Sequence, residues 1–444
     1  MNYFNADQVA ALAPDPSSLK SGRELANALK WESYACNERV LFGEIKGSGK
    51  EPYRTQIDLQ QLGFKCSCPS RKFPCKHGLG LLFLRAQQGD SFPQSTAEPP
   101  WVSEWMDKRS ERAAGKAEAS ESAAAEEAAT AKRTKEKEKR DSKRQSSVEA
   151  GAAELELWLR DMLRIGLLAL PEKEPAYFEK TAARMVDAKA TGLGNWVLGF
   201  TKLPYTHPRQ WQGQALGQAA RLYLLIQGLK NLDKQTPLVQ EDIRALVGWN
   251  LKKEELLQRT DLETVEDQWL VLARVVSQEP NDITLYKFWL YGQKSRKFAL
   301  LLDFAYRSMP IQTLLAPGTS VAATLVYYPS NWPLRALVKT QGETSPEMPV
   351  TAPEFTSWAS VQPYIAQVIS RMPWATEIPM LVGPLRLIPQ EERWFLFDKE
   401  NAAMEVQGAS SDELWDILAQ TGGRAVSFFL LRSEHSVKPL AWQH

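Results

Sequence analysis

Cysteine is scarce in this sequence and long apolar runs are missing, and both features limit what the protein can be. Only four of its 444 residues are cysteine, which does not suit a secreted fold stapled by disulfides. No apolar segment reaches the roughly 18 residues of a membrane-spanning helix. Residues 1–7 also lack the basic start and apolar core of a signal peptide. We therefore expect a cytoplasmic protein without a membrane segment.

An excess of charge of one sign is also missing. Lysine and arginine together number 54 and aspartate and glutamate 53, which leaves a formal net charge of +1. The whole molecule therefore has no field that draws it to nucleic acid or to a membrane, and any charged partner must meet a local patch. The hydrophobic fraction of 43% is enough for a core, and the length predicts about three domains.

Three of the four cysteines, Cys66, Cys68 and Cys75, stand within ten positions of one another, and His77 follows them closely. A Cys-x-Cys pair projects two ligands from the same side of an extended segment, because side chains alternate there with period two. Three thiolates and one imidazole complete a tetrahedral Zn²⁺ shell with no open position for water. The pattern predicts one structural zinc ion. Cys36 lies outside this set and is expected to be a small buried hydrophobic residue.

The segments around the cysteines predict a small ββα module. Residues 38–60 contain two apolar or alternating runs separated by the turn-forming residues 46–52, which is typical of a β-hairpin. Residues 78–85 are almost entirely apolar and predict a short buried helix that begins just after the last cysteine. The predicted order is therefore strand, strand, metal loop, helix.

This pattern, Cys-x-Cys, a short gap and Cys-x-His after a hairpin, resembles the SWIM zinc finger over about residues 53–86. The resemblance implies zinc-ligand roles for Cys66, Cys68, Cys75 and His77. Bacterial SWIM zinc finger domain-containing proteins are often encoded beside MoxR-type AAA ATPases and von Willebrand A-domain proteins, so the resemblance implies a partner of that kind. Further segments that are similar to such bacterial proteins are residues 46–53, 68–77, 99–102, 157–161 and 183–188.

The rest of the chain predicts an α+β multidomain protein. Residues 1–106 are expected to form an amino-terminal domain containing the finger. Residues 107–150 are charged and of low complexity, and predict a linker that is disordered, a fluctuating helix or a coiled coil. Residues 151–310 predict a mainly helical domain, with helices over 176–190, 209–230, 238–247, 252–258, 265–277 and 283–291. Residues 311–444 predict an α+β module.

The linker carries a local excess of basic charge. Between residues 132 and 144 eight lysines and arginines face three acidic residues. A charge run of this kind is typical of a solubilising tether, and an arm that binds nucleic acid is the alternative.

Cations and aromatic rings also gather around the predicted metal site, where phosphate contact and base stacking would use them. The alternative is that Phe64 and Phe73 shield the metal while the basic side chains only face water. The candidate nucleic-acid contacts are Arg54, Lys65, Arg71, Lys72, Lys76 and Arg85.

Two functions remain open at this point. The first is a non-enzymatic adaptor or scaffold that binds nucleic acid or protein. The second is an unrecognised enzyme with its site in the carboxy-terminal half, among carboxylates such as Asp187, Asp267 and Asp303, and with the finger used for targeting.

Overall fold

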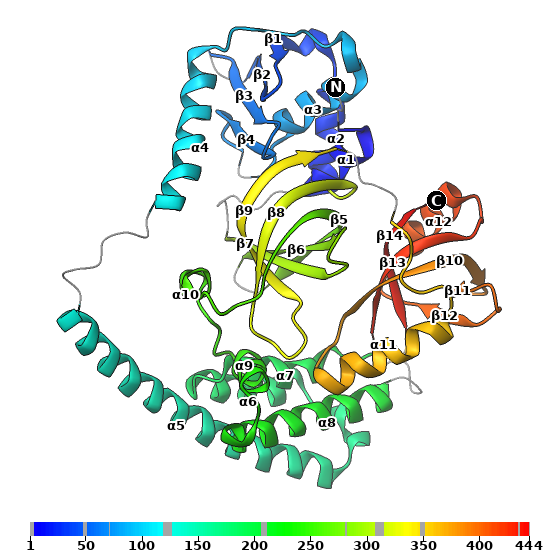
Figure 1. The fold of residues 1–444 in the computed structure, drawn as a ribbon. Coiled ribbons are helices and arrows are strands. Elements are labelled where there is room, and N and C mark those ends of the chain that lie inside the picture. The colour runs from blue at the N-terminus through cyan, green and yellow to red at the C-terminus, as the bar shows by residue number, and fades with distance from the viewer. Residues whose placement is uncertain are drawn as a thin grey trace.

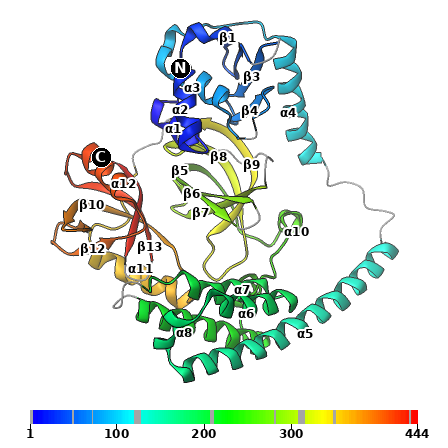
Figure 2. The ribbon, with the colours of Figure 1, turned by 180° about the vertical axis from the view of Figure 1, so that it is seen from behind.

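The structure is a computed structural model that describes residues 4–47, 51–70, 72–118, 127–205, 211–279, 282–306, 315–346, 351–433 and 436–443. Figure 1 shows a small amino-terminal domain, a helical region and two β-barrels. The first barrel lies between the amino-terminal domain and the helical region, and the view from behind shows the same arrangement (Figure 2). The expected α+β multidomain architecture is confirmed.

The amino-terminal domain is built on a four-stranded antiparallel sheet in the order β1-β2-β3-β4. The predicted hairpin over 38–60 is confirmed as β2 and β3, and the helix predicted over 78–85 lies within α3. Its elements are α1 (Ala6–Leu12), α2 (Pro16–Glu24), β1 (Trp31–Cys36), β2 (Val40–Ile45), β3 (Tyr53–Asp58), β4 (Gly63–Cys66), α3 (Lys76–Gln88) and α4 (Pro100–Glu118).

Helix α4 covers one face of this sheet. Val102 and Met106 are buried against Val40 and Phe42. The same helix is tied to the end of β3 by an ion pair between Arg109 Nε and Asp58 Oδ2 at 3.0 Å. The outer face of the hairpin is therefore a packing surface for α4.

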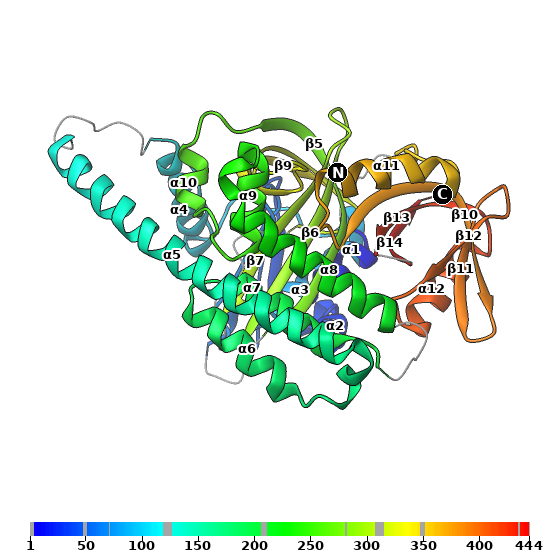
Figure 3. The same cartoon turned by 90° about the horizontal axis from the view of Figure 1, so that it is seen from below.

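The helical region follows, and its long first helix extends beyond the others (Figure 3). Its core contains Leu155, Leu159, Leu193, Leu222 and Ile243, all buried. The helices are α5 (Glu127–Ile165), α6 (Pro175–Asp187), α7 (Thr191–Leu198), α8 (Trp211–Lys230), α9 (Pro237–Leu246) and α10 (Lys253–Gln258).

The predicted linker over 107–150 is helical wherever the structure describes it. Helix α4 runs to Glu118 and α5 begins at Glu127, while residues 119–126 lie outside the described residues. Alanine, glutamate, lysine and arginine are strong helix formers, which explains a helical backbone without an apolar stripe. Val148 is already buried in the core of the helical region, so the predicted boundary at 150 falls inside α5.

Two five-stranded closed barrels make up the rest of the chain. The strands run in the orders β5-β6-β7-β9-β8 and β10-β11-β12-β14-β13, so each barrel has its own strands in the order 1-2-3-5-4. In each barrel the third and fifth strands pair in parallel and the other neighbours are antiparallel. The first barrel consists of β5 (Thr264–Glu279), β6 (Ile283–Gly292), β7 (Phe298–Tyr306), β8 (Thr319–Tyr327) and β9 (Arg335–Ser345).

The second barrel has helices of its own. Helix α11 (Trp358–Arg371) precedes it, and α12 (Ser411–Thr421) connects its third and fourth strands. Both helices contribute buried side chains to the barrel interior, among them Val361, Ile365, Leu414 and Ile417. Its strands are β10 (Ile378–Gln390), β11 (Arg393–Phe397), β12 (Ala403–Val406), β13 (Val426–Arg432) and β14 (Val437–Gln443).

The helices predicted over 265–277 and 283–291 are wrong, because these residues form β5 and β6. Both faces of these strands are buried. Trp269 and Val271 point into the core of the barrel, while Leu270 and Leu272 pack in the cluster shared with the second barrel. The sequence therefore shows an unbroken apolar run instead of alternation, and such a run does not distinguish a strand from a buried helix.

The first barrel and the amino-terminal domain share one hydrophobic core. In the sequence the helical region lies between these two parts. Gln8 Nε2 in α1 donates to the Gly318 carbonyl at 2.6 Å, at the start of β8. Arg274 in β5 donates to the carbonyls of Leu12 and Ala13 at 3.1 and 2.8 Å. Burial lowers the pKa of Arg274 to about 10, so its guanidinium stays charged at neutral pH.

The remaining contacts join the second barrel and the helical region to the first barrel. Phe429 lies with its ring centroid 6.0 Å from those of Trp289 and Phe298. The Asn331 amide, just before β9, donates to Asp242 Oδ2 of α9 at 3.0 Å. No helix in the described part of the chain is long and apolar enough to span a membrane.

Candidate metal centre

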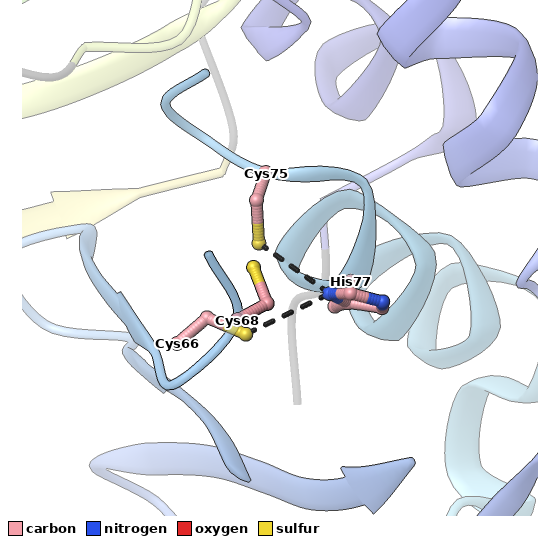
Figure 4. A group of neighbouring side chains, drawn as sticks. All are labelled: Cys66, Cys68, Cys75 and His77. Atoms are coloured by element: carbon pink, nitrogen blue, oxygen red, sulfur yellow. Dashed lines mark hydrogen bonds between the residues drawn. The ribbon is translucent and has the colours of Figure 1, made fainter. Parts of the chain in front are cut away.

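The four predicted ligands lie together at the point where the sheet meets α3 (Figure 4). Cys66 is the last residue of β4, and Cys68 follows it in the loop. Cys75 is the residue before α3, and His77 lies in the first turn of that helix. One ligand atom from each residue lies within 4.8 Å of all the others.

The distances between the ligand atoms suit a single tetrahedral ion. Nδ1 of His77 lies 3.7 Å from Sγ of Cys66 and 4.0 Å from Sγ of Cys75. Zinc bonds of about 2.3 Å to sulfur and 2.0–2.1 Å to nitrogen give tetrahedral edges of about 3.5–3.8 Å. The imidazole therefore presents Nδ1 to the metal position, as Figure 4 shows. The Cys₃His set fits one structural zinc ion, and such a shell has no vacant position.

Neighbouring groups hold the sulfur atoms in place. The hydroxyl of Thr55, which is buried on β3, lies 3.1 Å from Sγ of Cys66. Cys75 occupies the cap position of α3 and its side chain makes no capping hydrogen bond, so its sulfur remains available to a metal. The amino terminus of a helix favours a thiolate there through its partial positive charge.

Without metal, the pKa values of Cys68, Cys75 and His77 shift in different directions. Hydrogen bonds from Cys66 and Cys75 lower the pKa of the Cys68 thiol, whereas hydrogen bonds with Cys66 and Cys68 raise the pKa of the Cys75 thiol. Burial acts to lower the pKa of His77, but hydrogen bonds with Cys66 and Cys68 outweigh it and raise that pKa to about 9. Zinc must therefore displace protons when it binds at neutral pH.

Aromatic rings close around this site. Phe64 and Phe73 contact each other edge to face at 6.0 Å between centroids, and both pack against the core of the domain. Gly78 makes room for the first ring, because a Cβ at this position would lie 2.8 Å from Cδ1 of Phe64. These contacts favour the interpretation that the two phenylalanines shield the metal.

Comparison with known families agrees with this geometry. Residues 53–86 match the model of the SWIM zinc finger, the segment that contains all four ligands. The chain carries a SWIM zinc finger. Residues 143–247 match the model of the SWIM-associated four-helix bundle domain, which covers α5 from its middle to the end of α9. Searches of curated proteins and of solved structures gave no significant match.

The cations predicted around the SWIM finger differ in what they contact. Lys65 and Lys76 are exposed. Arg54 forms an ion pair with Glu44 at 3.0 Å, and Lys72 forms one with Asp15 at 3.0 Å. Half of these four side chains are thus already paired with carboxylates.

Arg85 is wrong as a candidate surface contact, because it is only 4% exposed. Its guanidinium lies over the ring of Phe92, 5.2 Å from the centroid, and donates to the carbonyl of Gly89 at the end of α3. A position in the helical run 78–85 was the available signal for this structural role. Arg71 lies outside the described residues.

Cys36 is buried as expected, with 1% of its surface exposed. Its sulfur accepts a hydrogen bond from Nε2 of Gln94 at 3.2 Å. Cys36 lies on β1, at the opposite edge of the sheet from β4, which carries the metal ligand Cys66. It is a packing residue of the domain and not a fifth ligand.

Proposed function

We propose that this chain is a non-catalytic adaptor that binds nucleic acid and uses its SWIM finger as a structural element. The main support is the architecture of the two barrels. In each barrel three consecutive antiparallel strands are followed by two strands that close the barrel in the order 1-2-3-5-4. The OB-fold is also a five-stranded barrel, and its members bind oligonucleotides and oligosaccharides. This is an analogy of fold, and a fold alone does not locate a binding site.

The zinc site supports a structural role for the finger. A shell of four protein ligands has no position for a reactive water, so the zinc would not activate a nucleophile. The site also lies in a domain whose core continues into the first barrel. The finger would then hold the amino-terminal domain in the shape that docks on that barrel.

The proposal is tested with the zinc-loaded full-length chain and fluorescein-labelled single-stranded DNA and RNA of 20 nucleotides. Fluorescence anisotropy at several salt concentrations should show binding that weakens steeply as salt rises, because phosphate contacts release counterions. Absence of binding to either strand at low salt would contradict the nucleic-acid role. The full chain is required because residues 1–106 share their core with the first barrel.

A protein partner is a separate part of the proposal. The resemblance to SWIM proteins encoded beside MoxR-type AAA ATPases and von Willebrand A-domain proteins is its support. An affinity pull-down of the tagged chain from its native cell, after cross-linking, should enrich a protein of either class. Enrichment of neither class, with the tagged chain recovered intact, would contradict this partnership.

An enzyme remains a second candidate, and one polar cluster in the carboxy-terminal half favours it. Tyr291 Oη donates to Oε1 of Glu354 at 2.9 Å, and Arg296 lies 3.9 Å from the same carboxylate. Burial raises the pKa of Glu354, and a carboxyl group with a raised pKa suits general acid catalysis. A small molecule that raises the Tm of the wild type but not of Glu354→Gln would support an active site there.

The carboxylates considered from the sequence do not form such a site together. Asp187 is exposed on α6, whereas Asp267 and Asp303 lie on β5 and β7, with β6 between them. Asp267 accepts the backbone amides of residues 294 and 295, and these hydrogen bonds overcome burial and lower its pKa. Its role is to fix the turn between β6 and β7.

A further inference from the structure

A groove of about 940 Å³ lies between the middle of α5, the turn from α6 to α7, and the segment that connects α9 to α10. This volume is within the range of ligand-binding sites in proteins. It is remote from the zinc ligands, which lie in the amino-terminal domain. We call it the α5–α9 groove.

The α5–α9 groove has a basic lining. Four cationic side chains line it, together with two acidic ones, Glu241 and Glu255. Glu241 lies 3.6 Å from a cation of its own helix, Arg244. Lys189 and Lys252 are exposed and form no ion pair with another residue in the described part of the chain. The four cations are Arg144, Lys189, Arg244 and Lys252.

Arg144 is held in a fixed position at the wall of the groove. Its Nη2 donates to the carbonyl of Gly248 at 3.0 Å, and its guanidinium lies over the ring of Trp249, 5.0 Å from the centroid. Its Nε is buried and has no hydrogen-bond partner among the described residues. The contacts with Gly248 and Trp249 therefore fix where the guanidinium lies at this wall.

The floor of the groove is also fixed. Gly248 has φ of 99° and lies against the start of α7, where an added Cβ would stand 2.4 Å from Oγ1 of Thr191. The Gly192 amide donates to the carbonyl of Val247 at 3.1 Å, which ties the same segment to α7. The cations therefore project from a rigid frame, which limits the entropy lost when a ligand binds.

The groove continues into the most basic segment of the sequence. Residues 132–144 of α5 contain eight lysines and arginines and three acidic residues, and the last of the eight is Arg144 itself. Thirteen helical residues span roughly 20 Å at 1.5 Å per residue. The phosphates of each strand of a duplex rise about 3.4 Å per nucleotide along the helix axis, so a segment of this length spans about six nucleotides of a duplex strand. An extended polyanion matches this length better than a small anion.

We propose that the α5–α9 groove forms a site for the phosphate backbone of a nucleic acid. This site rests on the proposed function and adds to the barrels a phosphate-binding surface on the helical region. Arg144, Lys189 and Lys252 contact phosphate oxygens within the groove, and the net positive charge of the sequence that precedes Arg144 in α5 adds to the attraction. Recognition of this kind depends on charge and carries no base preference.

The test compares two double charge reversals in the full-length, zinc-loaded chain. Lys189→Glu with Lys252→Glu changes two cations of the groove. Lys180→Glu with Lys202→Glu changes two exposed lysines of the helical region that do not line the groove by the same total charge and serves as the control. Binding of the labelled 20-nucleotide strands is measured by anisotropy at several salt concentrations, and circular dichroism checks folding. Lys189→Gln with Lys252→Gln replaces the groove variant if that variant is misfolded.

The groove variant should bind about tenfold more weakly, and its salt slope should fall by about 1.4, the share of two phosphate contacts to a single strand. The control should bind nearly as the wild type does. If wild type binds nucleic acid and both variants weaken equally, the groove is not the site although the proposed function stands. If wild type does not bind, both proposals fail. If polyglutamate of the same length displaced the labelled strand as well as unlabelled nucleic acid does, the groove would not be specific for phosphate.

Discussion

The two barrels have the same strand order but obtain the helices that fill their cores from different places. The second barrel takes them from its own neighbourhood, because α11 precedes its first strand and α12 connects its third and fourth strands. The first barrel shares its core with α1 and α3, which belong to the amino-terminal domain and lie far away in the sequence. The core of the second barrel is therefore completed by helices close to it in the sequence, whereas the core of the first barrel depends on the amino-terminal domain.

Because of this difference, the zinc site is expected to affect the stability of the first barrel and not that of the second. The metal ties β4 to α3, and α3 packs against α1 and α2 on the side that faces the first barrel. Gly80 permits close contact of these helices, since a Cβ there would lie 2.6 Å from Cβ of Leu25. Loss of the metal should therefore weaken the first barrel while leaving the second barrel intact.

The largest expected effect comes from removing a zinc ligand. Cys75→Ala should lose the metal and destabilise the amino-terminal domain by several kcal/mol, because metal binding supplies much of the folding free energy of such a site. Hydrogen exchange measured by mass spectrometry should show lost protection in β1–β4 and in β5–β9, with β10–β14 unchanged. Elemental analysis should find no zinc.

The matched control for this change is Cys36→Ala, which removes a buried thiol that lies outside the metal shell. It should retain one zinc ion per chain and lose much less stability. Equal loss of protection in both barrels after Cys75→Ala would contradict the dependence of the first barrel alone on the finger.

A pair of smaller truncations separates the two barrels directly. Leu12 on α1 is fully buried in the core shared with the first barrel, and Leu414 on α12 is buried in the second barrel. Each change to alanine should cost about 2–5 kcal/mol. Leu12→Ala should raise exchange in β5–β9, and Leu414→Ala should raise it in β10–β14. A reversed or uniform pattern would show that the barrels do not fold with these helices.

The zinc site should also give the first barrel a pH dependence. Its metal-free His77 has a pKa of about 9, above its usual value, so below that pH zinc must displace a proton from the imidazole. The raised pKa of Cys75 adds a second proton. Zinc affinity should therefore fall as pH drops from 8 to 6, by about tenfold, or 1.36 kcal/mol, per pH unit for each proton released.

Competition with a chromogenic chelator at several pH values measures this affinity. The metal-free protein has the opposite trend, because a pKa raised on folding contributes stability that is present below about 6.5 and is lost as pH rises through about 9. Zinc affinity that does not change between pH 6 and 8 would mean that neither His77 nor Cys75 holds a proton that zinc must displace.

Local features of this protein were predictable from its sequence, and long-range packing was not. The zinc ligands lie within twelve consecutive residues, so their spacing alone indicated the site. Strands such as β3 alternate and were recognised for that reason. The strands β5 and β6 bury both faces, one in the barrel and one against the second barrel, and their apolar runs resembled helices. The core that α1 shares with β5–β9 joins segments about 260 residues apart, for which a single sequence carries no signal.

The candidate nucleic-acid contacts illustrate the same limit. Clustering of charge in the sequence named Arg85, but only the helical phase of α3 decides that this side chain points inward. In the sequence Arg144 is one of eight cations of a run that predicts a tether or a nucleic-acid arm, and its contacts with Gly248 and Trp249 are not predictable because they join residues about a hundred positions apart. Which cations face a ligand is therefore settled by packing.

The smallest expected effect comes from a substitution that weakens only the second barrel, at the cap of α12. Ser410 caps α12, where its hydroxyl accepts the Glu413 amide at 3.2 Å and the carboxylate of Glu413 accepts the Ser410 amide at 2.7 Å. Ser410→Ala removes one half of this capping box and should cost about 1 kcal/mol. Exchange should rise in α12 and β13 without any change in zinc content or in β5–β9. Ser410→Asp, which keeps a capping acceptor, should restore the protection. A change that reached the first barrel would mean that the barrels share stability through their common contact at Phe429, and local closure of the second barrel would then be the wrong description.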